Sequence, residues 1–280
     1  MKKILIPTDF SDNAWDALMY AVRLYDDIRC TFFILNTFQS SPSNVTNMMR
    51  KKRDTPIFQY VKTNSEKELQ KIAHHLNNHL LNDLHAYKTL SVTGPLITIM
   101  KQVVAAENID LIVMGTAGAT GAKEIFLGSN TVKAMKHIDL CPIISVPKDY
   151  VFQEPEQVIF ATDFKRHFNS IEFENLLELQ SIYNFNITVL HIQAESALDV
   201  IQQQNKKALQ HFFDKKNVVF EEIKFDTSVA KAITSYVKKH EVDMICLLNY
   251  EHSFMESLLH EPILKKISFH SAVPLLIVQV

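Results

Sequence analysis

Glycine is scarce in this chain of 280 residues, which has five where an average composition would give about 20. Four of the five, Gly115, Gly118, Gly121 and Gly128, fall within one short segment, and the second half of the chain has none. Glycine permits backbone dihedrals and close backbone approaches that other residues disfavour. We therefore expect residues 115–128 to need one or the other.

Long apolar runs, an excess of positive charge and an even set of cysteines are also missing. No run approaches the about 20 apolar residues of a membrane span, and the apolar stretch at residues 4–6 is too short for a signal-peptide core. Lys and Arg number 29 against 31 Asp and Glu, so no net positive charge attracts nucleic acid or an anionic membrane. The three cysteines lie in or beside apolar runs, as reduced thiols do. We expect a cytoplasmic protein that binds neither DNA nor a membrane.

The composition that remains, 47% hydrophobic and 21% charged, is that of a globular protein, and the length predicts two domains at about 150 residues each. Short β-branched runs alternate with helix-length amphipathic segments, which indicates βαβ units around a parallel sheet. The strands predicted in the first half are Lys3–Thr8, Thr31–Thr37, Tyr87–Val92, Leu111–Met114 and Pro142–Val146.

Helix starts are marked by capping residues and by proline. The first helix is predicted to run to about residue 26 and the third to about residue 108, and the second is predicted to be long. The predicted starts of the four helices are Ser11 or Asp12, Asn64 or Ser65, Pro95, and Ser129.

The second half of the chain repeats the signatures of the first. The repeated pairs are Ile6–Phe10 with Phe160–Phe164, Asp110–Val113 with Asp243–Cys246, and Cys141–Ile144 with Val273–Leu276. The first copy is longer, mainly in the polar residues 39–63. These pairs predict a tandem duplication, with domains at residues 1–148 and 155–280.

The glycine segment follows a predicted buried strand and opens a predicted helix. Ligands of open parallel sheets bind beyond the carboxyl ends of the strands, often against a helix N-terminus whose free N–H groups attract anions. Backbone N–H groups and the hydroxyls of Ser129 and Thr131 suit phosphate. The spacing is neither that of a P-loop nor that of the dinucleotide fingerprint.

The spacing of Gly115, Gly118, Gly128 and Ser129 follows G-x2-G-x9-G-[S/T], and in this the chain closely resembles the nucleotide-binding branch of the universal stress protein family. Three further segments carry the likeness, which extends over both copies: Pro7–Ser11, Gly94-Pro95 and Ile109–Gly115.

This resemblance implies a fold and a mode of assembly. The fold is α/β, with two tandem Rossmann-like domains of the adenine nucleotide alpha hydrolase type, each a five-stranded parallel sheet with helices on both faces. Related proteins dimerise through the terminal strand, so Pro142–Val146 and Pro274–Val280 are expected to pair as an internal pseudo-dimer. Whether the whole chain forms a homodimer stays open.

The resemblance also implies that the first copy holds ATP, with Mg²⁺ able to join the phosphates. Asp9 would accept hydrogen bonds from adenine or ribose or lie near the metal, and Met114 would pack on the base. Thr37 would flank the base, where the family usually has an aliphatic residue. The implied site residues are Pro7, Thr8, Asp9, Thr37, Met114, Gly115, Gly118, Gly128, Ser129, Asn130 and Thr131.

The second copy keeps the Thr-Asp pair, as Thr162 and Asp163, but not the glycine segment. Aligned on the repeated strands, the positions of Gly115, Gly118, Gly128 and Ser129 hold Leu248, Glu251, His260 and Glu261. Carboxylates repel phosphate. We predict that the second copy does not bind ATP in the same way.

The function predicted is an ATP-binding, cytoplasmic stress-response regulator with a protein partner that the sequence does not identify. Three alternatives stay open: glycines that merely close a tight turn while Asp9 caps the first helix, a scaffold without nucleotide, and a slow ATP hydrolase in whose site Asp9 is the only acid. His75 and His79 are read as an exposed helix face rather than a metal site, and Arg50–Arg53 as a solvated loop.

Overall fold

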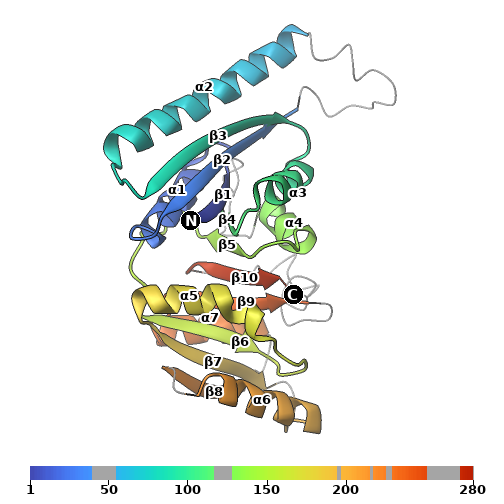
Figure 1. The fold of residues 1–280 in the computed structure, drawn as a ribbon. Coiled ribbons are helices and arrows are strands. Elements are labelled where there is room, and N and C mark those ends of the chain that lie inside the picture. The colour runs from blue at the N-terminus through green and yellow to red at the C-terminus, as the bar shows by residue number, and fades with distance from the viewer. Residues whose placement is uncertain are drawn as a thin grey trace, which may run out of the picture.

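Ten strands of the described part of the chain form one continuous sheet in the order β3-β2-β1-β4-β5-β10-β9-β6-β7-β8 (Figure 1). The computed structural model describes residues 1–39, 55–116, 128–193, 197–214, 217–224, 229–250 and 272–279. The strands are β1 Lys2–Pro7, β2 Cys30–Phe38, β3 His85–Thr93, β4 Leu111–Gly115, β5 Ile143–Val146, β6 Gln157–Thr162, β7 Asn186–Gln193, β8 Val218–Lys224, β9 Met244–Asn249 and β10 Leu275–Gln279. The helices are α1 Asp12–Leu24, α2 Pro56–His79, α3 Leu96–Glu107, α4 Ser129–His137, α5 Glu174–Tyr183, α6 Val200–Phe212 and α7 Val229–Lys239, with a 3₁₀ turn at Ser170–Phe173.

Each half contributes five parallel strands in the same order, and the halves meet where β5 and β10 pair antiparallel, with Ile144 opposite Leu276. The α/β fold with a largely parallel sheet is as predicted, and so is the pairing of the two terminal strands. That pairing places β5 and β10 in the middle of the sheet, so its outer edges are β3 and β8.

Helices cover both faces of the sheet because strand side chains alternate between them. Ile4 and Ile6 of β1 join a core that α1, α2, α5 and α6 close, whereas Leu5 joins the opposite core with α3, α4 and α7. Both cores run from the first half into the second.

Three of the four predicted helix starts agree with the structure, and α2 does not. Pro56 occupies its first turn and Thr55 caps it, accepting a hydrogen bond from Phe58 N, so α2 begins eight residues before Asn64. Ser65 lies inside the helix, buried, and its hydroxyl donates to Asn36 Oδ1 at 2.7 Å. The prediction was wrong because a polar side chain engaged in a buried hydrogen bond resembles an N-cap in sequence.

Side chains also tie the two halves together outside the sheet. Lys2 forms an ion pair with Glu178, and the Tyr183 hydroxyl donates to Leu24 O at 2.9 Å. The domain limits at 148 and 155 remain predictions.

The three cysteines are free and buried, as small hydrophobic residues are. Burial raises the pKa of the Cys30 and Cys141 thiols to about 12. Among the described helices, none has the length and apolar character needed to cross a membrane.

Candidate functional site

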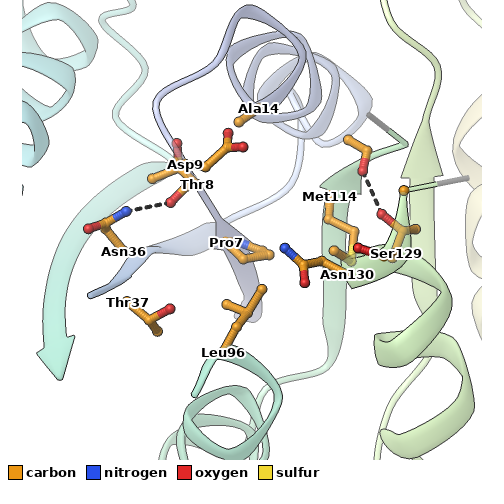
Figure 2. A pocket seen from close by; sticks show the side chains of 13 residues that line it. Pro7, Thr8, Asp9, Ala14, Asn36, Thr37, Leu96, Met114, Ser129 and Asn130 are labelled. Carbon is orange, nitrogen blue, oxygen red and sulfur yellow. Dashed lines mark hydrogen bonds between the residues drawn. The ribbon is translucent and has the colours of Figure 1, made fainter. Parts of the chain in front are cut away.

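A cavity of about 390 Å³ opens at the carboxyl ends of β1, β2 and β4 (Figure 2). The strand order reverses between β1 and β4, so the cavity lies at the topological switch point, the usual ligand position in such sheets. Its lining consists of Pro7, Thr8, Asp9, Ala14, Asn36, Thr37, Leu96, Met114, Gly115, Gly128, Ser129, Asn130 and Thr131.

The structure brings together ten of the eleven site residues implied by the resemblance, all of them in this lining. The eleventh, Gly118, lies outside the described residues, as do Gly121 and the basic run Arg50–Arg53. Sequence reasoning missed Ala14, Asn36 and Leu96. Asn36 carried a signal, because it is a polar residue that ends an apolar run.

The Thr-Asp pair forms a tight turn after β1. Thr8 Oγ1 accepts a hydrogen bond from Phe10 N at 3.0 Å, and Asp9 Oδ1 accepts from Ser11 N at 3.1 Å and from Ser11 Oγ at 2.6 Å. Phe10 has a φ of 65°, in the left-handed region that non-glycine residues seldom occupy. Asp9 therefore fixes the turn that leads into α1, but it does not cap this helix as the tight-turn alternative expects, because Ser11 is the N-cap and its hydroxyl accepts from Ala14 N at 3.3 Å.

The same turn recurs in the second half, where Thr162 Oγ1 accepts from Phe164 N and Asp163 Oδ1 accepts from Lys165 N, each at 3.0 Å. Phe164 has a φ of 56°. The first half has the glycine segment and the second half lacks it, yet both have this turn. The hydrogen bonds of the turn therefore belong to the fold, and any contact of Asp9 with a ligand would be a second role beside them.

A hydrogen-bond chain fixes the β2 side of the cavity, and Figure 2 shows its first bond, between Asn36 and Thr8. Asn36 Nδ2 donates to Thr8 O at 2.7 Å, and its Oδ1 accepts from Ser65, whose hydroxyl pairs with that of Ser91 at 2.8 Å. The Asn36 amide is thus used by the scaffold. Thr37, the next residue, remains half-buried in the lining.

The N-terminus of α4 forms the opposite wall. Gly128 is its N-cap, and no side chain among the described residues caps the first-turn N–H groups of this helix, whose residues 128–131 line the cavity. Thr131 is buried, and its hydroxyl donates to Gly115 O at 2.8 Å. The group that Thr131 can offer to a ligand is therefore its backbone N–H. Ser129 and Asn130 are exposed.

Gly115 is needed for packing as well as for the cavity. A Cβ at this position would lie 2.5 Å from Asn13 Oδ1 and 2.8 Å from Asn13 O. Asn13 is buried on α1 and donates to Val146 O at 3.3 Å. Glycine at this position therefore lets α1 lie close to the end of β4.

The cavity has two chemically different sides. Pro7, Leu96 and Met114 give it an apolar side, and the α4 N-terminus gives it a side that attracts anions. Asp9 is the only acidic or basic side chain among the described residues of the lining. Such a site suits a flat, largely apolar group that carries a negatively charged extension.

Larger side chains stand at the equivalent place among the described residues of the second half. The strand registers put Leu248, which is buried, at the position of Gly115, and His191 at that of Asn36. The Tyr250 hydroxyl donates to Asp163 Oδ1 at 2.9 Å, and the Arg166 guanidinium lies 5.0 Å from the centre of the Tyr250 ring. Burial and the nearby Asp163 raise the pKa of Tyr250. Glu251, His260 and Glu261 lie outside the described residues.

The histidines of α2 pack on each other and on α1. The rings of His75 and His79 lie 4.7 Å apart, and His75 meets the edge of Trp15 at 5.1 Å. No group of three His, Cys, Asp or Glu side chains in the described part of the chain is arranged to hold a metal ion.

Comparison with known proteins agrees with this fold. The sequence profile of the universal stress protein family matches residues 1–147, which is more than half of the chain. No curated protein sequence matches. A universal stress protein from Archaeoglobus fulgidus DSM 4304 is similar over 99% of this chain and 96% of its own, with 16% identity and a TM-score of 0.72.

Two further solved structures are similar. A functionally unknown protein from Pseudomonas aeruginosa PAO1 covers 99% of this chain and 92% of its own, with 10% identity and a TM-score of 0.60. A universal stress protein from Lactobacillus plantarum covers 51% of this chain and 96% of its own, with 20% identity and a TM-score of 0.44.

Three observations define the class of protein: helices on both faces of a largely parallel sheet, a cavity at the switch point of that sheet, and the profile match. The chain belongs to the universal stress protein family.

Proposed function

We propose that the first half of the chain binds ATP in the cavity at the ends of β1, β2 and β4, and that the bound nucleotide regulates contacts with a protein partner in the cytoplasm. The observation that carries the proposal is the meeting of Asp9, Met114 and the uncapped α4 N-terminus around one cavity. Its volume of about 390 Å³ lies within the range of small-molecule sites.

The residues present fit ATP. The first-turn N–H groups of α4 and the exposed Ser129 hydroxyl would bind phosphate oxygens, which the helix dipole favours. Pro7, Leu96 and Met114 would pack on adenine, and Thr37 would lie beside it. Asp9 would accept from the ribose or lie near Mg²⁺, which neutralises phosphate charge when bound.

Equilibrium dialysis with Mg·ATP tests the proposal. We expect the wild-type chain to take up one ATP, and Gly128→Glu, which places a carboxylate at the phosphate side, to lose most of this uptake. Gln70→Glu, on an exposed position of α2, is the control because it adds the same charge away from the cavity. Equal uptake by wild type and Gly128→Glu would reject the site.

Two further measurements separate the alternatives. No ATP uptake and no thermal shift with Mg·ATP would favour a scaffold without nucleotide. Phosphate release that disappears in Asp9→Ala would indicate a hydrolase. We expect release to be slow, because Asp9 is the only acid in the described lining.

A further inference from the structure

Helix α4 connects the cavity of the first half to the second half. Its first turn lines the cavity, where Thr131 anchors it to Gly115 O. Its nine residues extend about 13 Å, so its last turn lies well outside the cavity. A single short helix transmits a displacement of one end to the other.

The last turn of α4 is capped by residues of the second half. Ile138 donates its N–H to Ala134 O, and the carbonyls that follow in the helix lack a donor four residues on. Asn249 Nδ2, at the end of β9, donates to Met135 O at 2.9 Å, and Gln279 Nε2 of β10 lies 3.4 Å from the same oxygen. Asn249 also donates to Gln279 Oε1 at 2.6 Å, which orients both amides.

The first half does not offer the same amide pair in return. The registers place Thr116 at the position of Asn249 and Pro147 at that of Gln279. The Thr116 hydroxyl is buried and has no hydrogen-bond partner among the described residues, and proline has no donor. Among the described residues, the amide hydrogen bonds to α4 therefore run from the second half to the half that holds the cavity.

We infer that Asn249 is a positioning residue for the phosphate end of the proposed nucleotide site, acting through α4, and this inference rests on the proposed function. Tyr250, the next residue, is held by Asp163, so the Asn249 amide has a fixed place in the second half. The second half thus completes a site that lies in the first. Loss of the amide leaves the buried Met135 carbonyl poorly satisfied and frees the last turn of α4 to shift.

Asn249→Leu tests the inference because leucine has a similar size and no donor. Asn205→Leu is the control: Asn205, which is buried where Asn249 is half-buried, also donates to a carbonyl, Phe164 O at 2.8 Å, but on α6 and within the second half. Binding of ATP and of adenosine is measured for both variants and for wild type. We expect Asn249→Leu to weaken ATP binding about three- to tenfold with adenosine binding unchanged, and Asn205→Leu to alter neither.

Hydrogen exchange of the α4 amides supplies a readout that needs no nucleotide. We expect faster exchange in residues 130–138 of Asn249→Leu, and a smaller increase in Gln279→Leu if the first variant folds poorly. Failure of the wild type to bind ATP would overturn the proposed function and with it this inference. An unchanged preference for ATP over adenosine in Asn249→Leu, or unchanged α4 exchange, would overturn the inference alone.

Discussion

A Cβ on Gly115 would lie 2.5 Å from Oδ1 of Asn13, closer than real side-chain contacts allow. This relationship joins the end of β4 to the first turns of α1. It gives the first glycine of the G-x2-G-x9-G-[S/T] pattern a packing role that does not depend on any ligand.

Gly115→Ala is expected to lower the free energy of unfolding by about 1–3 kcal/mol, because the added methyl group overpacks a buried contact. Asn13→Ala in the same chain should relieve only part of this loss, since the backbone oxygen of Asn13 would also lie 2.8 Å from the added Cβ. Urea unfolding of the two single variants and the double variant measures the coupling. Strictly additive losses would show that the two residues do not clash.

The fold follows from sequence because its signals are local, whereas most of the cavity lining was implied by the family resemblance of the glycine spacing and the strand ends. A buried β-branched strand, a Thr-Asp turn and a capping serine such as Ser11 are each written in a few adjacent residues. The prediction for the start of α2 was wrong because Ser65 donates a hydrogen bond to Asn36, which is distant in sequence, and does not cap the helix. Leu96 in the lining and the Asn249–Met135 contact could not be predicted for the same reason. Both depend on how elements that are far apart in the chain pack together.

Asp9→Ala and its counterpart Asp163→Ala should separate the fold role of the turn from a ligand role. Both carboxylates accept a backbone N–H two residues on, so both variants should lose about 0.5–2 kcal/mol of stability. Only Asp9→Ala should weaken ATP binding. Thermal unfolding and equilibrium dialysis measure the two effects, and equal ATP binding by both variants would leave Asp9 as a turn residue alone.

Ser129 and Thr131 should behave differently although both begin α4. Thr131→Val loses the hydroxyl bond to Gly115 O and should be destabilised by about 1–2 kcal/mol. Ser129→Ala removes an exposed hydroxyl, so it should keep its stability and lose about three- to tenfold in ATP affinity. Calorimetry on the two variants checks the contrast. A destabilised Ser129→Ala would contradict the exposed position of that side chain.

The contact between the halves should weaken in alkali. Burial raises the pKa of Tyr183 to about 12, above the usual 10, so its contribution to stability is complete below pH 10 and is lost as the pH rises toward 12. Tyrosinate also cannot donate to Leu24 O. Tyr183→Phe should therefore be less stable than wild type at pH 8 and differ less from it at pH 11.5. Denaturant titrations at both pH values give the difference, and a constant gap would refute this assignment.

The most direct test of the central claim is a crystal structure of the chain grown with excess Mg·ATP. The account predicts the triphosphate against the first-turn N–H groups of α4 and adenine beside Met114 and Thr37, with the second half free of nucleotide at Asp163. A cavity that holds only solvent, or ATP bound elsewhere, would contradict it.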